Sequence, residues 1–264
     1  MSRVFEGVGH GGNDPGAVAN GNVEANINLV MALACDEVLK RHGVETKLSR
    51  TKNENDSLDE EIRECNAYKP NLAVEFHNNA GGGDGFEIFH SINGGLGKTL
   101  AINIEKEVIN FGQNSRGIKT KKNSAGKDYF GFIRSTVCPA VIVEGFFVDN
   151  TTDSKDFNTI EKQKAFGVAV AKGILKTLGI TFKPTSGQAT GSFYRVICQS
   201  FKDKNNALKK QKELKSINID SFLDFYNGYY RVVAGSFKDK SYAEKRVNEL
   251  KSLEHDCFIA YYNN

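Results

Sequence analysis

The chain has 264 residues, of which 39% are hydrophobic and 25% are charged. This composition is typical of a globular protein with one large domain or two domains of unequal size. The formal net charge of +3 is too small to indicate nucleic-acid binding by itself. The cysteines are scattered and include no C-x-x-C pair, which argues against a disulfide scaffold and a cysteine zinc site and favours reduced thiols.

The first residues lead directly into a predicted strand, and the sequence contains no apolar run of secretory or membrane-spanning length. We therefore expect a protein that is made in the cytoplasm without a signal peptide and has no membrane segment.

The first 180 residues alternate predicted strands with predicted helices. Short apolar runs predict strands at 4–8, 44–48, 72–80, 85–89 and 140–143. Helical patterns predict helices at 23–41, 57–68, 97–110 and 160–178, and residues 116–128 are predicted to form a polar connection. This alternation predicts an α/β fold, a twisted and mostly parallel sheet flanked by helices, with its functional sites at the carboxyl ends of the strands.

Ionisable residues stand at several of those strand ends. His10 follows the first strand, His77 lies near the end of the strand at 72–80, and Glu144 follows the fully apolar run at 140–143. Two histidines and a carboxylate are typical of a catalytic zinc site with an open fourth position, and a further carboxylate is then needed to transfer protons. His10, Glu24 and His77 fit the ligand set, and Glu144 fits the proton-transfer role.

Simpler explanations exist for two of these residues taken singly. His77 alone is better explained as a hydrogen-bonded residue at a strand end, and Glu24 alone as an acid in the first turn of a helix, where the helix dipole favours it. No spacing rule links residues this far apart in the chain, so the residue types alone leave a metal hydrolase as one interpretation.

A second region follows residues 181–192, whose proline, glycine and small polar residues predict a linker. Residues 193–226 and 229–262 form a repeat that aligns without gaps, and each copy reads strand, helix, strand. Because one copy cannot bury its sheet face alone, the two copies are predicted to pair. The result would be a small α+β domain at 193–264 with a four-stranded antiparallel sheet and two helices.

Four segments of the first region resemble, in the same order, the motifs of the zinc-dependent N-acetylmuramoyl-L-alanine amidases of the amidase-3 family: GVGHGGNDPGA, NVEANINL, VEFHNNA and PAVIVEGFFVDN. The resemblance covers about residues 3–179. It implies a catalytic domain at 1–180 in which His10, Glu24 and His77 hold Zn²⁺ and Glu144 is the catalytic glutamate. It also implies the bond that is cut, the amide between the lactyl group of N-acetylmuramic acid and L-alanine in peptidoglycan.

Two positions depart from the family's usual pattern. Glu75 stands two residues before the second histidine, where the family usually has a small residue. It is either a hydrogen-bonding partner of His77 or a solvated acid at the strand end, and we favour the second interpretation. The first loop also lacks the aspartate that the family often has near Gly7, so the sequence identifies no partner for His10.

The tail, at about 191–262, resembles a SPOR domain, a peptidoglycan-binding module of two half-repeats. The resemblance implies binding to glycan strands already stripped of peptides. Aromatic side chains stack on sugar rings, and the candidates are Tyr194, Phe201, Tyr230 and Phe237, although core packing also explains aromatic residues in strands. A four-stranded sheet with paired aromatics is also found in RNA-binding modules, but the lysines of the tail recur with acids, as on a solvated helix face.

The remaining candidates carry little functional signal. Phe130 and Phe132 either line the substrate groove or pack in the core. His42, His90 and His255 are predicted to be surface residues.

Taken together, these patterns predict a cell-wall lytic enzyme, a zinc amidase joined to a glycan-binding domain, with peptidoglycan and not nucleic acid as its partner. It would reach the wall only after membrane failure or release, as phage endolysins and mother-cell lytic amidases do, and the sequence does not choose between these two. The alternatives are a non-catalytic wall-binding protein with a decayed amidase site, against which the four intact residues count, and an RNA-binding protein.

Overall fold

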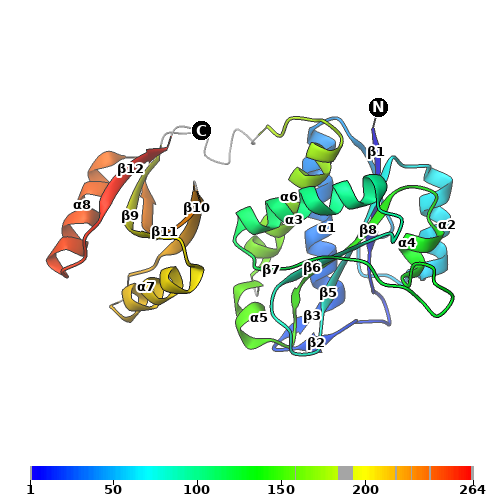
Figure 1. Ribbon diagram of the computed structural model, residues 1–264, viewed down its shortest axis with the longest axis horizontal. Coiled ribbons are helices and arrows are strands. Elements are labelled where there is room, and N and C mark those ends of the chain that lie inside the picture. The colour runs from blue at the N-terminus through cyan, green and yellow to red at the C-terminus, as the bar shows by residue number, and fades with distance from the viewer. Residues whose placement is uncertain are drawn as a thin grey trace. The chain divides into compact units, whose positions relative to one another are not determined.

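The computed structural model describes residues 2–157, 159–183, 193–217, 219–226, 228–237 and 239–262. The chain divides into two compact units, Met1–Phe182 and Lys183–Asn264, and Figure 1 labels the elements of each. Most of the predicted linker at 181–192 lies outside the described residues. Within the described residues, none of the helices is long and apolar enough to cross a membrane.

The first unit is built on a six-stranded sheet in the order β4-β1-β5-β8-β6-β7. Its strands are β1 (Arg3–Val8), β4 (Glu45–Leu48), β5 (Leu72–Asn79), β6 (Phe86–His90), β7 (Ser115–Lys119) and β8 (Ala140–Phe147). Neighbouring strands from β4 to β8 are parallel, whereas β6 runs antiparallel to β8 and parallel to β7. A small hairpin, β2 (Val18–Ala19) and β3 (Asn22–Val23), follows β1. The predicted α/β fold with a mostly parallel sheet is confirmed.

Helices cover both faces of this sheet. In Figure 1, α1 (Glu24–Arg41), α3 (Gly95–Phe111) and α6 (Ile160–Thr177) lie on one side, and α2 (Leu58–Tyr68) and α4 (Gly131–Ser135) lie on the other. The short α5 (Thr151–Phe157) follows β8. Strand side chains alternate between two cores: Val74 and Phe76 pack with Met31 of α1, whereas Ala73 packs with Phe132 of α4. His77 has the same parity as Ala73, so it projects towards the side of α2 and α4.

Two sequence predictions for this unit are wrong. The predicted polar connection at 116–128 begins inside β7, an edge strand that is only partly buried and therefore lacks the apolar alternation that would reveal it. His90, predicted to be a surface residue, is 6% exposed and its Nδ1 lies 2.7 Å from the carbonyl oxygen of Ser91. It is buried because it ends β6 inside the sheet, next to β8.

The second unit repeats one pattern twice. The first copy has β9 (Phe193–Phe201), α7 (Lys204–Ser216) and β10 (Phe222–Tyr226), and the second has β11 (Tyr229–Phe237), α8 (Lys240–Ser252) and β12 (Phe258–Tyr262). Corresponding elements have equal lengths, and both helices are capped by the side chain of an aspartate, Asp203 or Asp239. The strands form one antiparallel sheet in the order β10-β11-β9-β12, which confirms the predicted small α+β fold.

One face of this second sheet packs against α7 and α8. Its inner residues include Val196 and Val232, which contact Leu214 and Leu250 of the helices. The four aromatic residues predicted to be candidates for sugar stacking, Tyr194, Phe201, Tyr230 and Phe237, all pack against this helix-facing core. Of the two explanations that the sequence left open for them, core packing is the one that the structure supports. Tyr194 and Tyr230 share the parity of Val196 and Val232, and Phe201 and Phe237 are paired with Tyr230 and Tyr194 across irregularities in the pairing of β9 with β11.

Candidate metal centre

Two features fix His10 just beyond the end of β1: the conformation of its backbone and a contact with Asp14. The φ of His10, 62°, lies in the left-handed region, which is uncommon for a residue other than glycine. The buried Arg50 secures this strand end by donating Nε to the carbonyl of Val8 (3.0 Å) and Nη2 to the carbonyl of Gly9 (3.2 Å). Oδ2 of Asp14 lies 2.8 Å from Nδ1 of His10. Asp14, in the same loop, is thus the partner of His10 that the sequence did not identify.

Glu24 is the first residue of α1 and is only 3% exposed. Its Oε2 accepts a hydrogen bond from the backbone N–H of Ala17 (2.9 Å), and its Oε1 accepts one from the backbone N–H of Asn78 (3.0 Å). These two bonds hold the carboxylate between the loop that follows β1 and the end of β5. Glu24 is therefore fixed by more than the helix dipole.

The imidazole of His77, on β5, lies against Gly9, which has no side chain. A Cβ atom at Gly9 would lie 2.2 Å from the imidazole of His77, so only glycine leaves room for the ring. Nδ1 of His77 lies 3.1 Å from Oε1 of Glu24. The rings of His10 and His77 meet edge to face, with centroids 5.0 Å apart.

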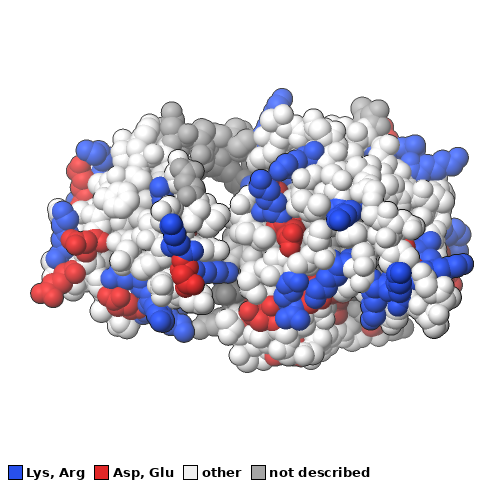
Figure 2. All heavy atoms as spheres, in the orientation of Figure 1, with Lys and Arg blue, Asp and Glu red and all other residues white. Residues whose placement is uncertain are grey.

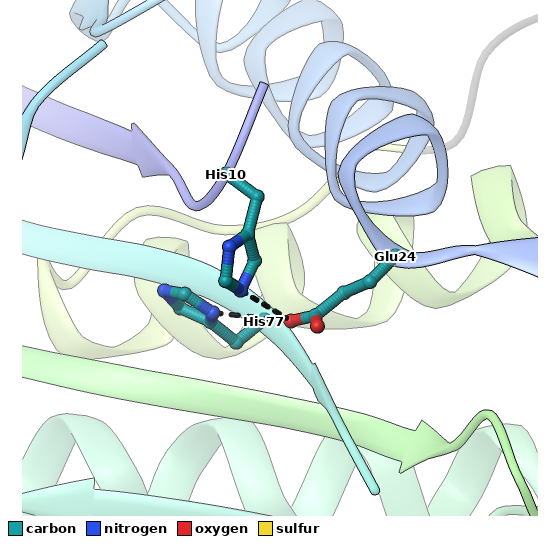
Figure 3. Close-up of side chains that lie close together, drawn as sticks. All are labelled: His10, Glu24 and His77. Atoms are coloured by element: carbon teal, nitrogen blue, oxygen red, sulfur yellow. Dashed lines mark hydrogen bonds and ion pairs between the residues drawn. The ribbon is translucent and has the colours of Figure 1, made fainter. Parts of the chain in front are cut away.

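Figure 3 shows His10, Glu24 and His77 converging on one point. Oε1 of Glu24 is 3.3 Å from Nε2 of His10 and 3.1 Å from Nδ1 of His77, and one ligating atom from each residue lies within 4.8 Å of the others. In a tetrahedral zinc site with bonds of about 2.0–2.2 Å, neighbouring ligand atoms are about 3.3–3.6 Å apart. The donor types fit zinc, and the distances from Oε1 of Glu24 to the two imidazole nitrogens are close to this range.

The electrostatics of the group favour a cation at this point. Burial acts to raise the pKa of Glu24, but the hydrogen bonds with His10 and His77 outweigh it and hold that pKa well below its usual range. The hydrogen bond with Glu24 raises the pKa of His10. Burial acts to lower the pKa of His77, but its bonds with carboxylates raise it overall. The ionised Glu24 therefore attracts positive charge, which a divalent cation supplies in place of protons.

Glu144 lies beside this group. It is paired with His77 in the register of β5 and β8, and both residues line a pocket of about 370 Å³. Burial raises the pKa of Glu144 to about 7. A carboxyl group with such a pKa both accepts and releases a proton near neutral pH, as a general acid–base requires.

The rest of the pocket combines an apolar wall with acids. The wall is formed by Leu58, Phe130, Phe132 and Ile142, and the further acids are Asp14, Asp56, Glu61 and Glu75. Phe132 is also a core residue with 1% exposure, so it fulfils both roles that the sequence left open. Asp56 and Glu61 were missed because they stand in an acidic stretch that reads as a solvated helix face.

The prediction that Glu75 is solvated is wrong. Glu75 is 5% exposed and its Oε1 lies 3.5 Å from Nε2 of His77, so it is not a solvated acid at a strand end. It is buried because α2 brings Glu61 over the same position on the sheet face.

An α/β sheet whose strand ends carry three side chains that could hold a metal ion, next to a carboxyl group and an open pocket, is typical of the class of metal-dependent hydrolases. Comparison with known proteins is more specific. The chain belongs to the N-acetylmuramoyl-L-alanine amidase family, whose model matches residues 7–176, and a SPOR domain model matches residues 175–261. It is a zinc-dependent cell-wall amidase with a C-terminal peptidoglycan-binding module.

Similar proteins include cell-wall enzymes from bacteria and phage. The N-acetylmuramoyl-L-alanine amidase CwlM of Bacillus licheniformis is 33% identical over 226 residues, which cover 83% of each chain. The endolysin of Bacillus phage SPP1 is 33% identical over 239 residues, covering 86% of this chain and 81% of its own. The catalytic domain of CwlV, an N-acetylmuramoyl-L-alanine amidase from Bacillus (Paenibacillus) polymyxa var. colistinus, superimposes with a TM-score of 0.62 at 27% identity, covering 69% of this chain and 100% of that domain.

Proposed function

We propose that the first unit hydrolyses the amide bond between the lactyl group of N-acetylmuramic acid and L-alanine, with His10, Glu24 and His77 holding Zn²⁺ and Glu144 transferring protons. One observation carries this proposal. The ligating atoms of the three residues converge, and the pocket beside them is also lined by Glu144.

The separate roles of zinc and Glu144 follow from the chemistry of amide hydrolysis. Bound zinc polarises a carbonyl oxygen and lowers the pKa of water towards neutrality. Glu144, as a carboxylate, accepts the proton of the attacking water and then donates it to the nitrogen of the departing L-alanine. The apolar wall of the pocket, which includes Phe130 and Ile142, offers contacts for the methyl groups of the lactyl and alanyl parts of the substrate.

We further propose that the second unit binds glycan strands through the sheet face opposite its helices. Arg195 and Arg231 lie on this face. Nη1 of Arg195 is 2.9 Å from Oδ2 of Asp224, and its guanidinium lies 4.4 Å from the ring centroid of Tyr262. Nη1 of Arg231 donates to the hydroxyl of Tyr262 (2.7 Å), and its guanidinium lies 4.0 Å from the ring centroid of Tyr226.

Exposed aromatic rings lie on the same sheet face as Arg195 and Arg231. Phe222, Tyr226 and Phe258 are 42%, 45% and 54% exposed, so their faces are open to sugar rings. On the face shown in Figure 2, Lys and Arg are interspersed with Asp and Glu over both units. The described residues on the face that is drawn thus form no patch of cations of the kind that a nucleic-acid surface gathers.

The enzyme acts on the cell wall, and we propose that it is made in the cytoplasm and reaches the wall after membrane failure or release. Two observations support this route. All five cysteines are free, as expected after synthesis in a reducing compartment, and the chain is similar to an endolysin.

The test combines zinc analysis with an assay for new L-alanine amino termini released from purified sacculi. The wild type should bind one equivalent of zinc and lose activity reversibly with a chelator. His77→Ala should lose both zinc and activity, whereas Glu144→Gln should keep its zinc and lose at least about 10²-fold in kcat. His255→Ala and Glu37→Gln, which change residues outside the site, should match the wild type.

Four outcomes would overturn parts of this proposal. Full activity of Glu144→Gln would remove its proton-transfer role, and zinc retention by His77→Ala would remove it from the ligand set. A zinc-loaded wild type that binds sacculi without releasing amino termini would be a wall-binding protein with a decayed site. Salt-sensitive retention of RNA, without binding to sacculi, would replace the glycan-binding role of the second unit.

A further inference from the structure

His77 has two ring nitrogens, and each faces a different carboxylate. Nδ1 is 3.1 Å from Oε1 of Glu24, on the side of the metal centre, and Nε2 is 3.5 Å from Oε1 of Glu75. Glu75 lies two residues before His77 on β5, so both side chains leave the same face of the sheet. A carboxylate on one ring nitrogen of a ligating histidine holds the proton there and leaves the other nitrogen free for the metal.

Glu75 is itself held in place by a second acid. Glu61 reaches the same position from α2 and is 4% exposed. Burial first, and then the charge of Glu75, raise the pKa of Glu61, so a protonated Glu61 can donate to the carboxylate of Glu75. The two carboxyl groups therefore form a buried pair that lines the pocket behind His77. Glu61 places Glu75 without touching the zinc ligands Glu24 and His10.

The space for this pair comes from the neighbouring strand. Gly7 of β1 is paired with Glu75 in the register of β1 and β5. A Cβ atom at Gly7 would lie 2.1 Å from Oε1 of Glu61 and 3.1 Å from Cγ of Glu75. The two departures from the usual family pattern, a missing acid near residue 7 and an extra acid at residue 75, thus fall on residues that lie side by side.

We propose that Glu75, held by Glu61 in the space left by Gly7, is a positioning residue that fixes the imidazole of His77 with Nε2 protonated and Nδ1 directed at the metal. This inference rests on the proposed role of His77 as a zinc ligand. In this chain the acid that positions a histidine would thus stand at Glu75 on β5, whereas the family often has an acid near residue 7, on β1. The arrangement requires Gly7, Glu61 and Glu75 together.

The primary test is zinc affinity, measured on the full chain by competition with a chromophoric chelator. Glu75→Ala should bind zinc about 10- to 100-fold more weakly than the wild type, the range typical of losing such a partner of a ligating histidine. Glu75→Gln keeps an accepting oxygen of the same reach and should restore part of this affinity. Gly7→Ala should weaken zinc binding as well, although it removes no polar group, because its Cβ displaces Glu61 and Glu75.

A second readout detects positioning directly. Long-range ¹H–¹⁵N NMR correlations of the histidine rings distinguish the two tautomers. In the zinc-loaded wild type, His77 should carry one ring proton, on Nε2, and in Glu75→Ala this proton should exchange faster with water. Glu37→Gln removes an exposed acid from α1 and should change neither readout.

The outcomes separate this inference from the proposal on which it rests. If His77→Ala loses zinc while Glu75→Ala and Glu75→Gln bind it within about twofold of the wild type, the positioning role is wrong and the metal site stands. If His77→Ala keeps its zinc, the ligand assignment is wrong. Should Glu75→Ala fail to fold, Glu75→Gln and Gly7→Ala decide, and wild-type zinc affinity together with wild-type exchange of the Nε2 proton in both would overturn the inference.

Discussion

Glu6 lies in the middle of β1 with no exposed surface, and its burial predicts a pH-dependent stability. Neither carboxylate oxygen has a conventional hydrogen-bond partner among the described residues. The thiol of Cys35, a weak donor, is a polar contact of this carboxyl group. Burial first, and then the charge of Asp36, raise the pKa of Glu6 well above its ordinary value. The change to test is Glu6→Gln, which keeps the shape of the side chain and cannot ionise.

The direction of the effect follows from the raised pKa. Below the unfolded-state pKa of about 4.3, both states hold the proton of Glu6 and its contribution to stability is fully present. Between that pH and the raised folded-state pKa, the unfolded chain releases the proton while the folded chain keeps it. The free energy of unfolding then falls by about 1.4 kcal/mol per pH unit from this one group. The loss is complete once the pH has passed the folded-state pKa.

Urea unfolding at pH 5, 6, 7 and 8, in the presence of a chelator so that metal binding does not contribute, measures this effect. The difference in free energy of unfolding between Glu6→Gln and the wild type should grow in favour of the variant by about 1.4 kcal/mol per unit as the pH rises from 5, and should level off where the pH passes the folded-state pKa of Glu6. Glu37→Gln, an exposed position on α1, corrects for the general loss of one acid. A difference that stays constant within about 0.5 kcal/mol over the whole range would refute the reasoning.

Two further predictions concern the sites of the two units. Gly9→Ala places a Cβ atom 2.2 Å from the ring of His77, so it should abolish stoichiometric zinc binding while circular dichroism shows a folded chain; retention of one zinc would contradict the geometry. Arg231→Ala removes the contacts of this residue with Tyr226 and Tyr262. It should weaken binding to peptide-free glycan strands by about tenfold, equivalent to about 1.4 kcal/mol, and leave cleavage of a soluble muramoyl peptide unchanged. Lys245→Ala, on the exposed surface of α8, is its control, and equal binding by both variants would place the glycan site elsewhere.

Sequence reasoning succeeded where the signal is local. The apolar run before Glu144 and the alternation of strands with helices predicted the sheet, because side-chain periodicity follows directly from backbone geometry. The repeat predicted the second unit for the same reason, since two copies of one pattern form the same elements. Local signals were weak at β7, an edge strand with little apolar content, and its prediction failed.

Sequence reasoning failed where the outcome depends on pairing between distant segments. The sequence left open whether four aromatic residues of the second unit stack on sugars or pack in the core, since the face that meets the helices is decided only when α7 and α8 pack. Glu75 was predicted to be solvated because no residue near it in the sequence indicates that Glu61 of α2 lies against it. Asp14 was overlooked as the partner of His10, because its role depends on how a loop of glycines turns.

The amino-acid sequence by itself determined most of the secondary elements, the two-part organisation and the residue types of the candidate site, two imidazoles, a carboxylate and a further carboxyl group. Only the tertiary structure decided that Nδ1 of His77 and Nε2 of His10 face Glu24, and that Gly7 makes room for the acids behind His77. The physical reason is that residue type and periodicity are properties of the chain, whereas the choice between two ring nitrogens depends on strand register and on which side chains meet across it.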